Sequence, residues 1–272
     1  MATPTAVRTL IKKTFSGRFA ISRLTRRPVV GKLVEHLLFD GDDLLILPKD
    51  ATINVNRSLS PREDLVLPSA VLERLIRTAR YHWIMDACIC REASGCEHYP
   101  TDLGCLFLGR AAMDINPAFG RPVTADAAID HARRCREAGL VHMVGRNKLD
   151  SVWLGVSPGN RLLTVCNCCE CCCLWRMLPY VAPVIAEKFH RLPGVRVTVT
   201  DRCVGCGTCA DSTCFVQAIS LADGRAVIDT AACRGCGRCV AVCPNGAIDM
   251  AITDAAYADK AFKRIRALVE VT

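Results

Sequence analysis

Apolar and polar positions in the first third of the chain predict one extended segment and one helix. Residues 41–58 are expected to be extended, because Leu44–Leu47 is an unbroken apolar run and residues 53–56 alternate between apolar and polar. A helix is expected to begin near Ser69, a favourable N-cap, and to run with one apolar face toward Ile84.

The middle of the chain predicts two further helices separated by short strands. The pattern over residues 124–138 is helical, and Thr124 is a good N-cap for it. Residues 140–144 and 151–156 are apolar enough for two short strands, arranged as a hairpin or a wing. Another helix is expected over residues 183–190.

The pattern changes from about residue 195. Val197–Val199 is typical of a strand, and residues 219–229 are expected to form a hairpin that turns at Asp223-Gly224. A helix that carries lysine and arginine is expected over residues 255–269.

The cysteine content changes this picture most, since 19 of the 272 residues are cysteines. In a small secreted protein such a count indicates a disulfide framework. Here the cysteines lie in tight runs, whose members rarely bridge each other but can direct several thiolates to one metal centre. The odd count also fits complete pairing poorly. Because 51% of the residues are hydrophobic, the chain can still build a packed core.

Charge is unevenly distributed, and the formal net charge is +8. The first acidic residue is Glu35, and eight lysines and arginines precede it, interleaved with apolar residues. Such a basic amphipathic segment is expected either to pack on the body of the protein or to contact an acidic partner protein or a membrane surface. Nucleic acid is not an expected partner, because aromatic interleaving and known nucleic-acid motifs are absent.

No secretory signal or membrane span is expected. The N-terminus lacks an uninterrupted apolar core of the kind that signal peptides have. The pair Arg26-Arg27 is not followed by a clean apolar run, and no stretch reaches about 18 uncharged apolar residues. The expected location is the cytoplasm, where thiols stay reduced.

The strongest motif is a repeated cysteine pattern near the C-terminus. The run Cys203-x2-Cys206-x2-Cys209 recurs thirty residues later as Cys233-x2-Cys236-x2-Cys239, and each run has a later fourth cysteine, Cys214 or Cys243. A C-x2-C-x2-C loop can curl around a [4Fe–4S] cubane, and its glycines let the backbone approach closely. The segment of about residues 196–252 resembles the bacterial-type 2[4Fe–4S] ferredoxins.

In these ferredoxins the fourth cysteine of each run ligates the other cluster. The resemblance therefore implies two [4Fe–4S] clusters, one on Cys203, Cys206, Cys209 and Cys243 and one on Cys233, Cys236, Cys239 and Cys214. The first repeat departs from the pattern, because it has one extra residue before Cys214 and Phe215 in place of proline. Zinc is the alternative for these cysteines, but zinc sites rarely use this spacing twice.

Two less familiar motifs hold the other metal-ligating candidates. The first consists of four cysteines with glycine and proline turns between them, which predict a nest for one cluster: Cys88, Cys90, Cys96 and Cys105. The second packs six cysteines into eight residues: Cys166, Cys168, Cys169, Cys171, Cys172 and Cys173. Adjacent side chains diverge, so the second run cannot serve one cubane and is expected to serve two neighbouring centres or one of higher nuclearity. Zinc, buried free thiols, a metallothionein-like store and a redox dithiol remain alternatives.

These motifs carry a second resemblance. The stretches 84–91, 104–109, 138–142 and 166–173 are similar to those of a poorly characterised family of iron–sulfur proteins with CxCR and CNCCxCCC motifs, whose members join such a domain to a ferredoxin module. The resemblance implies anaerobic electron transfer and one or two clusters beyond those of the ferredoxin module. Cys135 lies outside every run and is expected to be structural.

The expected fold class is α+β: a cysteine-rich α+β domain followed by a ferredoxin-like (βαβ)2 module with two clusters. The expected divisions are a basic segment 1–60, a cysteine-rich domain 61–195, a ferredoxin domain 196–252 and a C-terminal helix 253–272.

The expected function is multi-cluster electron transfer at low potential, between a redox partner protein and an acceptor within an anaerobic oxidoreductase complex. The sequence has no P-loop and no dinucleotide GxGxxG, so it offers no support for a nucleotide cofactor. The alternative is a reductase with a non-standard catalytic iron–sulfur centre in residues 88–173, fed by the ferredoxin clusters. A cluster carrier is a third, weaker interpretation.

Overall fold

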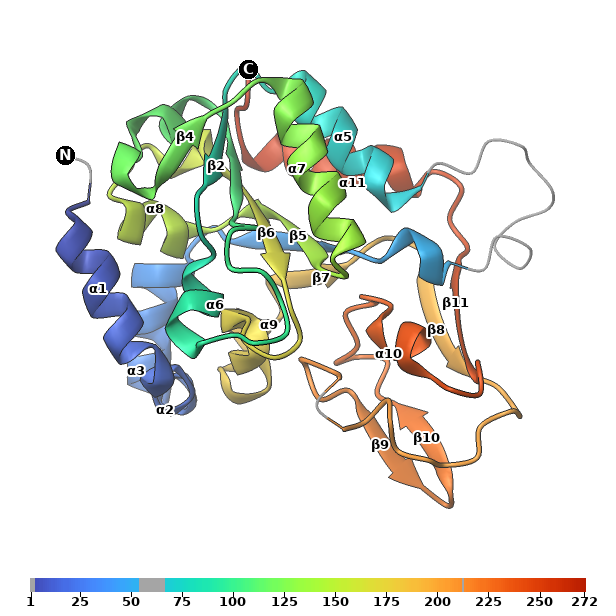
Figure 1. The fold of residues 1–272 in the computed structure, drawn as a ribbon. Helices are drawn as coiled ribbons and strands as arrows, with labels where there is room; N and C mark the ends of the chain where they lie inside the picture. The colour runs from blue at the N-terminus through green and yellow to red at the C-terminus, as the bar shows by residue number, and fades with distance from the viewer. Residues whose placement is uncertain (1–2, 54–66, 212) are drawn as a thin grey trace.

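A computed structural model describes residues 3–53, 67–211 and 213–272, and a seven-stranded sheet lies at its centre (Figure 1). The strands are, in spatial order, β4 (Gly120–Pro122), β2 (His82–Met85), β3 (Leu106–Leu108), β6 (Leu163–Cys168), β5 (Val141–Arg146), β1 (Asp43–Leu47) and β7 (Phe189–Arg191). Neighbours pair antiparallel except β1 and β7, which are parallel. The chain is therefore an α+β protein.

Alternation along the strands gives the sheet two buried faces. Leu45 and Leu47 of β1 join the core under one layer of helices, whereas Leu44 and Ile46 join a separate core on the other face. A strand buried on both faces reads as a continuous apolar run, which explains the unbroken Leu44–Leu47 segment.

Three helices cover the first face: α5 (Pro68–Thr78), α7 (Ala125–Glu137) and α11 (Tyr257–Leu268). In α5 the residues Leu72, Leu75 and Ile76 are fully buried, as their helical spacing predicts. The last helix of the chain returns to pack on α5, and Arg74 stacks over Phe262 with 3.9 Å between its guanidinium carbon and the ring centroid. Residues 68–78 and the C-terminal helix therefore share one core.

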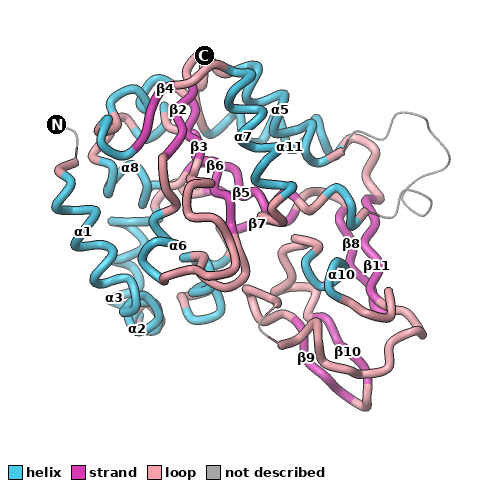
Figure 2. Tube along the Cα trace, viewed as in Figure 1, coloured by secondary structure: helices cyan, strands magenta, loops and turns pink. Residues whose placement is uncertain are grey.

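The second face is covered by shorter elements: α6 (Ile89–Ser94), α8 (Lys148–Leu154) and α9 (Pro183–Ala186). The helices α1 (Thr5–Thr14), α2 (Arg18–Leu24) and α3 (Pro28–Val34) lie along this side of the molecule, and α1 packs against α6 (Figure 1). Loops fill much of the remainder, including the segment between α6 and β3 (Figure 2).

The C-terminal cysteine segment builds two small sheets around one helix. Strand β8 (Val195–Val199) pairs antiparallel with β11 (Ile248–Ile252), and β9 (Ile219–Ala222) pairs with β10 (Arg225–Ile228). The helix is α10 (Arg238–Val242). Val195, Met250 and Ile252 belong to the same buried core as α5, so this segment is packed onto the rest of the protein.

Several sequence predictions are confirmed. Thr124 caps α7 by accepting a hydrogen bond from the Ala127 amide at 3.2 Å. The hairpin turns at Asp223 and Gly224, both with positive φ, and the C-terminal helix forms as expected.

Other predictions are wrong, and the reasons are tertiary. A strand was expected over 151–156, but residues 148–154 form a helix, whose first turn is held by a hydrogen bond from the Lys148 amide to Asp42. The first helix begins at Pro68 without a Ser69 cap and ends at Thr78, so Ile84 lies in a strand. The helix expected over 183–190 stops at Ala186 and gives way to β7. The predicted extended residues 54–58 lie outside the described part of the chain.

Candidate metal centres

The first C-terminal set of cysteines surrounds one small cavity. Its lining includes Cys203, Cys206, Cys209 and Cys243, so the fourth cysteine of the second repeat lies with the triplet of the first. The cysteine loop needs glycine: Gly205 has φ +69°, and a Cβ there would lie 2.2 Å from the Gly224 carbonyl oxygen.

Backbone amides in this set already point at sulfur. The amide of Ala226 donates to Cys203 Sγ at 3.4 Å, and that of Ala247 donates to Cys243 Sγ at 3.2 Å. Amide hydrogen bonds of this kind stabilise thiolate over thiol.

The second set brings Cys214 to the triplet of the second repeat. Burial, together with the nearby thiols of Cys214 and Cys233, raises the pKa of Cys236 to about 12. The pKa of Cys239 is raised by burial and then by the same neighbours together with Cys236. The four sulfurs therefore influence one another, which is the crosswise arrangement that the resemblance implied. The extra residue of the first repeat falls around Ser212, which lies outside the described residues.

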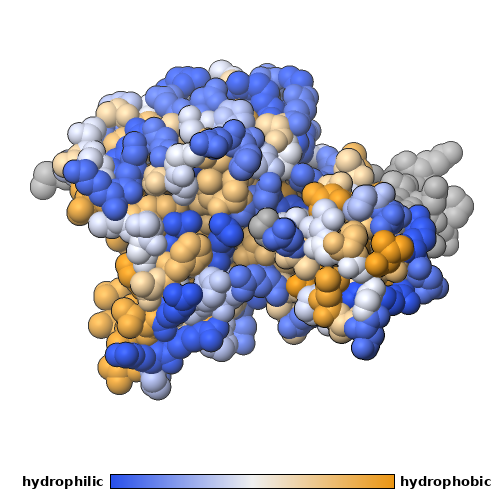
Figure 3. All heavy atoms as spheres, turned by 60° about the horizontal axis from the view of Figure 1, so that its bottom comes forward, coloured by the Kyte–Doolittle hydropathy of each residue, from blue (hydrophilic) through white to orange (hydrophobic). Residues whose placement is uncertain are grey.

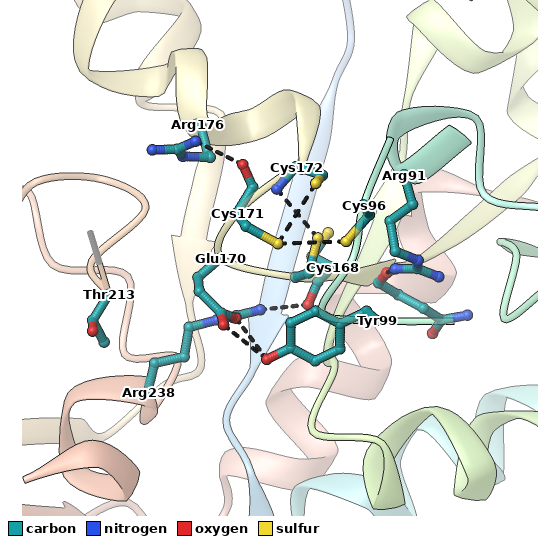
Figure 4. A network of polar contacts seen from close by, with 12 residues as sticks. Arg91, Cys96, Tyr99, Cys168, Glu170, Cys171, Cys172, Arg176, Thr213 and Arg238 are labelled. Carbon is teal, nitrogen blue, oxygen red and sulfur yellow. Dashed lines mark hydrogen bonds and ion pairs between the residues drawn. The ribbon is translucent and has the colours of Figure 1, made fainter. Parts of the chain in front are cut away.

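The ten cysteines of residues 88–173 divide differently from the sequence expectation. Cys96 does not stay with the other three cysteines of its motif but joins Cys169, Cys171 and Cys172, and the four sulfurs all lie within 4.8 Å of one another (Figure 4). Cys96 Sγ lies 3.6 Å from Cys171 Sγ. The prediction of a single nest for Cys88 to Cys105 is therefore wrong, because the loop after α6 carries Cys96 across to the loop after β6 (Figure 2). We call this set the four-thiol group.

A second cavity, of about 240 Å³, lies on the sheet face opposite α5 and α7; Cys169 of the four-thiol group reaches its wall, and the other six cysteines line it. They are Cys88, Cys90, Cys105, Cys166, Cys168 and Cys173, and we call them the six-thiol group. Cys166 and Cys168 are two residues apart on β6, so they project to the same face of the sheet. Cys88 caps α6 and Cys105 directly precedes β3, and these elements bring them to the same place.

Large apolar side chains close the six-thiol cavity. Ile11 and Phe15 come from the first two helical segments of the chain, and Trp153 and Trp175 complete the wall with Leu149 and Leu174. Hydrogen bonds to neighbouring thiols, together with burial, raise the pKa of Cys90, Cys166 and Cys173, whereas the partner thiols in these hydrogen bonds, Cys88 and Cys168, have a lowered pKa. Burial opposes thiolates in this cavity, and positive charge beside them favours them.

Arg91 provides one such positive charge and organises the loops. Its side chain is fully buried, and it donates hydrogen bonds to the carbonyl oxygens of Pro100 at 2.8 Å, Asn167 at 2.9 Å and Leu103. Although burial alone lowers the pKa of Arg91, the thiolates of Cys88 and Cys169 raise it above its ordinary value. One guanidinium thus ties the first cysteine motif to the second.

The sequence analysis missed Asp150, which lines the six-thiol cavity. Its carboxylate accepts hydrogen bonds from Asn147 at 2.7 Å, Trp153 at 2.8 Å and Thr164 at 2.9 Å. Burial raises its pKa, and the Cys168 thiolate raises it further. The helical position that points Asp150 inward was hidden by the expectation of a strand over 151–156.

Among the described residues, one ion pair joins the two cysteine-rich parts of the molecule (Figure 4). Arg238, which lies between Cys236 and Cys239, pairs with Glu170, which lies between Cys169 and Cys171, and also donates to the Cys168 carbonyl oxygen. Tyr99 donates its hydroxyl hydrogen to Glu170 at 2.8 Å. Arg238 is almost fully buried, so no solvent layer separates the second C-terminal cysteine set from the four-thiol group.

Residues 226–249 match the 4Fe-4S binding domain. The match covers the second cysteine triplet and Cys243. With the cysteine groups described above, it supports an iron–sulfur protein that functions in electron transfer. Comparisons with curated proteins and with solved structures give no match.

The residues present fit iron–sulfur clusters. Thiolates are the usual protein ligands of these clusters, and the structure brings cysteines together in groups of four or more at three places. Backbone amides donate hydrogen bonds to the sulfurs of Cys203 and Cys243, and Gly205 has the positive φ that lets the loop curl. Both features suit a loop that wraps an iron–sulfur cluster. Within the described residues, no helix is long and apolar enough to cross a membrane.

Proposed function

We propose that the protein passes low-potential electrons between a redox partner protein and an acceptor, through two ferredoxin-type [4Fe–4S] clusters and further clusters in residues 88–173. The proposed location is the cytoplasm, within an anaerobic oxidoreductase complex. The observation that carries the proposal is the Arg238–Glu170 ion pair, because cysteines flank both partners of the pair in sequence.

The order of the centres follows from their exposure. Cys206 of the first C-terminal set is exposed, so this set is the proposed point of contact with a partner protein. The second set lies against the four-thiol group through Arg238, and the six-thiol cavity lies beyond that group under its apolar wall. The proposed route therefore runs from the surface of residues 203–209 toward the cavity.

In this route the chain's own residues hold and tune the clusters, which supply the one-electron chemistry when bound. The thiolates fix the position of each cluster. Amide donors such as Ala226 and Ala247 stabilise negative charge on sulfur, and Arg91 and Arg238 offset the charge of the buried thiolates. The apolar wall of the six-thiol cavity excludes water.

The test is rapid-freeze EPR after anaerobic mixing with substoichiometric reduced methyl viologen. In the wild-type protein we expect the signals of the N-terminal clusters to appear after those of the ferredoxin clusters. Cys206→Ser and Cys236→Ser should slow that step at least about tenfold while the N-terminal clusters stay assembled. Unchanged rates in both variants would refute the proposed route.

A second candidate is a reductase whose catalytic centre is in residues 88–173. The six-thiol cavity favours it, because Asp150 and Arg91 lie at its wall as groups that could move or hold protons and charge. Binding of carbon monoxide or cyanide to the reduced protein, seen as a shift in the EPR or infrared spectrum, would support a centre with an open iron position. A spectrum that neither ligand changes would argue against catalysis there.

A further inference from the structure

The six-thiol group forms a closed ring around its cavity. Each thiol lies close enough to the next for a hydrogen bond or a direct charge interaction, in the order Cys88, Cys90, Cys173, Cys168, Cys166, Cys105 and back to Cys88. All six line the same cavity. No member is set apart as a spare thiol.

The number of thiols is wrong for ordinary cubanes. One [4Fe–4S] cluster takes four cysteine ligands, which would leave two thiols of the ring without iron, and two separate clusters would take eight. Six thiolates suffice for two cubanes that are joined to each other. Each cubane then takes three thiolates, and a bridging ligand connects the fourth iron of one cubane to the fourth iron of the other. The sequence shows the same division into three and three: residues 88–105 supply three of the six cysteines, and residues 166–173 supply the other three.

The charges around the ring suit a large anionic centre. Arg91 is buried beside Cys88 and Cys105, and Arg18 lies near Cys90 and Cys173, whose thiolates raise its pKa against the lowering effect of burial. Arg238 approaches from the side of Cys168. Arg91 lines the cavity, and Arg18 and Arg238 approach it, so three guanidinium groups offset the negative charge of the thiolates and of Asp150 in a wall that is otherwise mostly apolar.

We propose that Cys88, Cys90, Cys105, Cys166, Cys168 and Cys173 hold one polynuclear iron–sulfur centre of about eight irons, separate from a [4Fe–4S] cluster on the four-thiol group. The proposal deepens the proposed function and rests on its iron–sulfur chemistry. It concerns the size of one centre, so the iron content tests it whatever the rate of electron flow.

The experiment compares iron, acid-labile sulfide and zinc per chain, with Mössbauer spectra, in three anaerobically purified proteins. They are the wild type, the double variant Cys105→Ala/Cys166→Ala and the control Cys135→Ala. Cys135 is buried beside His131, at 3.7 Å, and belongs to neither thiol group. We expect about twenty irons in the wild type and the control, and a loss of about eight in the double variant with the ferredoxin EPR signals intact.

The wild-type measurement keeps the proposal testable even if the double variant does not fold. About sixteen irons in the wild type, or a loss of only about four in the double variant, would show an ordinary cubane in the cavity and overturn the proposal. Zinc in place of the missing iron would overturn it as well. By contrast, a full iron count with no electron transfer would refute the proposed function and leave this centre in place.

An independent observation concerns the surface of α1–α3, where apolar and basic side chains are exposed together. The exposed apolar residues are Leu10, Ile21, Leu24, Val29, Leu33 and Leu37, and Val29 reaches 81% exposure. Figure 3 shows apolar side chains gathered at the lower left, on the side where Figure 1 places these helices. Lys13, Arg23, Arg26, Arg27 and Lys32 are exposed on the same three helices and the short turn that joins two of them, and residues 3–34 contain no acidic residue.

We infer that this surface binds an anionic lipid bilayer. Glu92 of α6 pairs with Arg8 and Lys12 of α1, but the exposed basic residues named above lie on a segment without acidic residues. Such a basic amphipathic surface gains from apolar insertion and from attraction to negative headgroups together. A protein partner would be expected to offer a shaped recess, whereas exposed side chains distributed over three helices suit a fluid surface.

Sedimentation with vesicles of phosphatidylcholine and phosphatidylglycerol in equal parts tests the inference. We expect Val29→Glu/Leu33→Glu to bind at least about tenfold more weakly, and Val227→Glu, an exposed apolar control on β10, to bind like the wild type. Wild-type binding to phosphatidylcholine alone at equal strength, or no binding at all, would overturn it, and the latter would favour a protein partner.

Discussion

The two cysteine-rich parts of this protein both bring cysteines together in groups, but different features of the chain position the cysteines in each part. In residues 203–243 a repeated motif places each thiolate by local geometry, since the loop C-x2-C-x2-C curls by itself and only the fourth cysteine comes from elsewhere. In residues 88–173 the cysteines are sorted by the tertiary fold, because a sheet face and two loops decide which sulfurs meet. A locally encoded site can be recognised from sequence, whereas a site sorted by the fold needs the structure.

The largest difference between the regions should appear when one thiolate is removed from each. Cys171→Ala takes a ligand from the four-thiol group, and Cys239→Ala takes one from the second ferredoxin set. Each should lose about four irons and leave the other region's clusters intact, because the two groups share no ligand. Iron analysis with EPR checks this, and loss of all clusters from either variant would show that the regions do not assemble separately.

The next effect concerns Arg91, which has no counterpart in the ferredoxin segment. Arg91→Gln removes hydrogen bonds to three carbonyl groups, two of them buried, and one buried charge, so we expect it to destabilise the protein by about 3 kcal/mol or more. Thermal unfolding of the anaerobic holoprotein measures the loss. The exposed Arg121→Gln, which loses only its surface ion pair with Asp86, is the matched control and should change little.

A smaller effect is expected at the link between the regions. Glu170→Gln removes the charge that pairs with Arg238 but keeps an oxygen for the Tyr99 hydroxyl. We expect both sets of clusters to assemble and electron transfer between them to slow by about tenfold, as the loops lose their alignment. Rapid-freeze EPR measures the rate, and a rate equal to that of the wild type would mean that Glu170 only packs the interface.

The smallest effect is on the pH dependence of stability. Burial raises the pKa of Asp42 to about 7, and one of its carboxylate oxygens has no hydrogen-bond partner among the described residues. Because the folded pKa lies above the unfolded one, Asp42 contributes stability that is complete below about pH 4 and is lost as the pH rises through 7. Asp42→Asn should therefore raise the melting temperature at pH 8 relative to the wild type more than it does at pH 5. Equal differences at both pH values would contradict this account of Asp42.

What could be predicted from the sequence follows the same division. The crosswise grouping of Cys214 and Cys243 with the opposite triplets came from the resemblance to two-cluster ferredoxins, and the structure places these cysteines near the triplets that the resemblance implies. The transfer of Cys96 to the four-thiol group could not be predicted, since it depends on how two loops meet beyond the ends of β3 and β6. Asp150 was missed because its place also depends on tertiary contacts. It lies in a helix whose first turn is hydrogen-bonded to Asp42, whereas the sequence predicted a strand next to it.

The central claim is that residues 88–173 hold iron–sulfur clusters in contact with those of the ferredoxin segment. A potentiometric titration of the anaerobic protein, followed by EPR in the wild type and in Cys171→Ala, tests it most directly. We expect magnetic interaction between the reduced four-thiol cluster and its ferredoxin neighbour to broaden and split the wild-type spectrum, and Cys171→Ala to remove that part of the splitting. Identical spectra in the two proteins would mean that the four-thiol group holds no cluster in contact with the ferredoxin segment, and would contradict the claim.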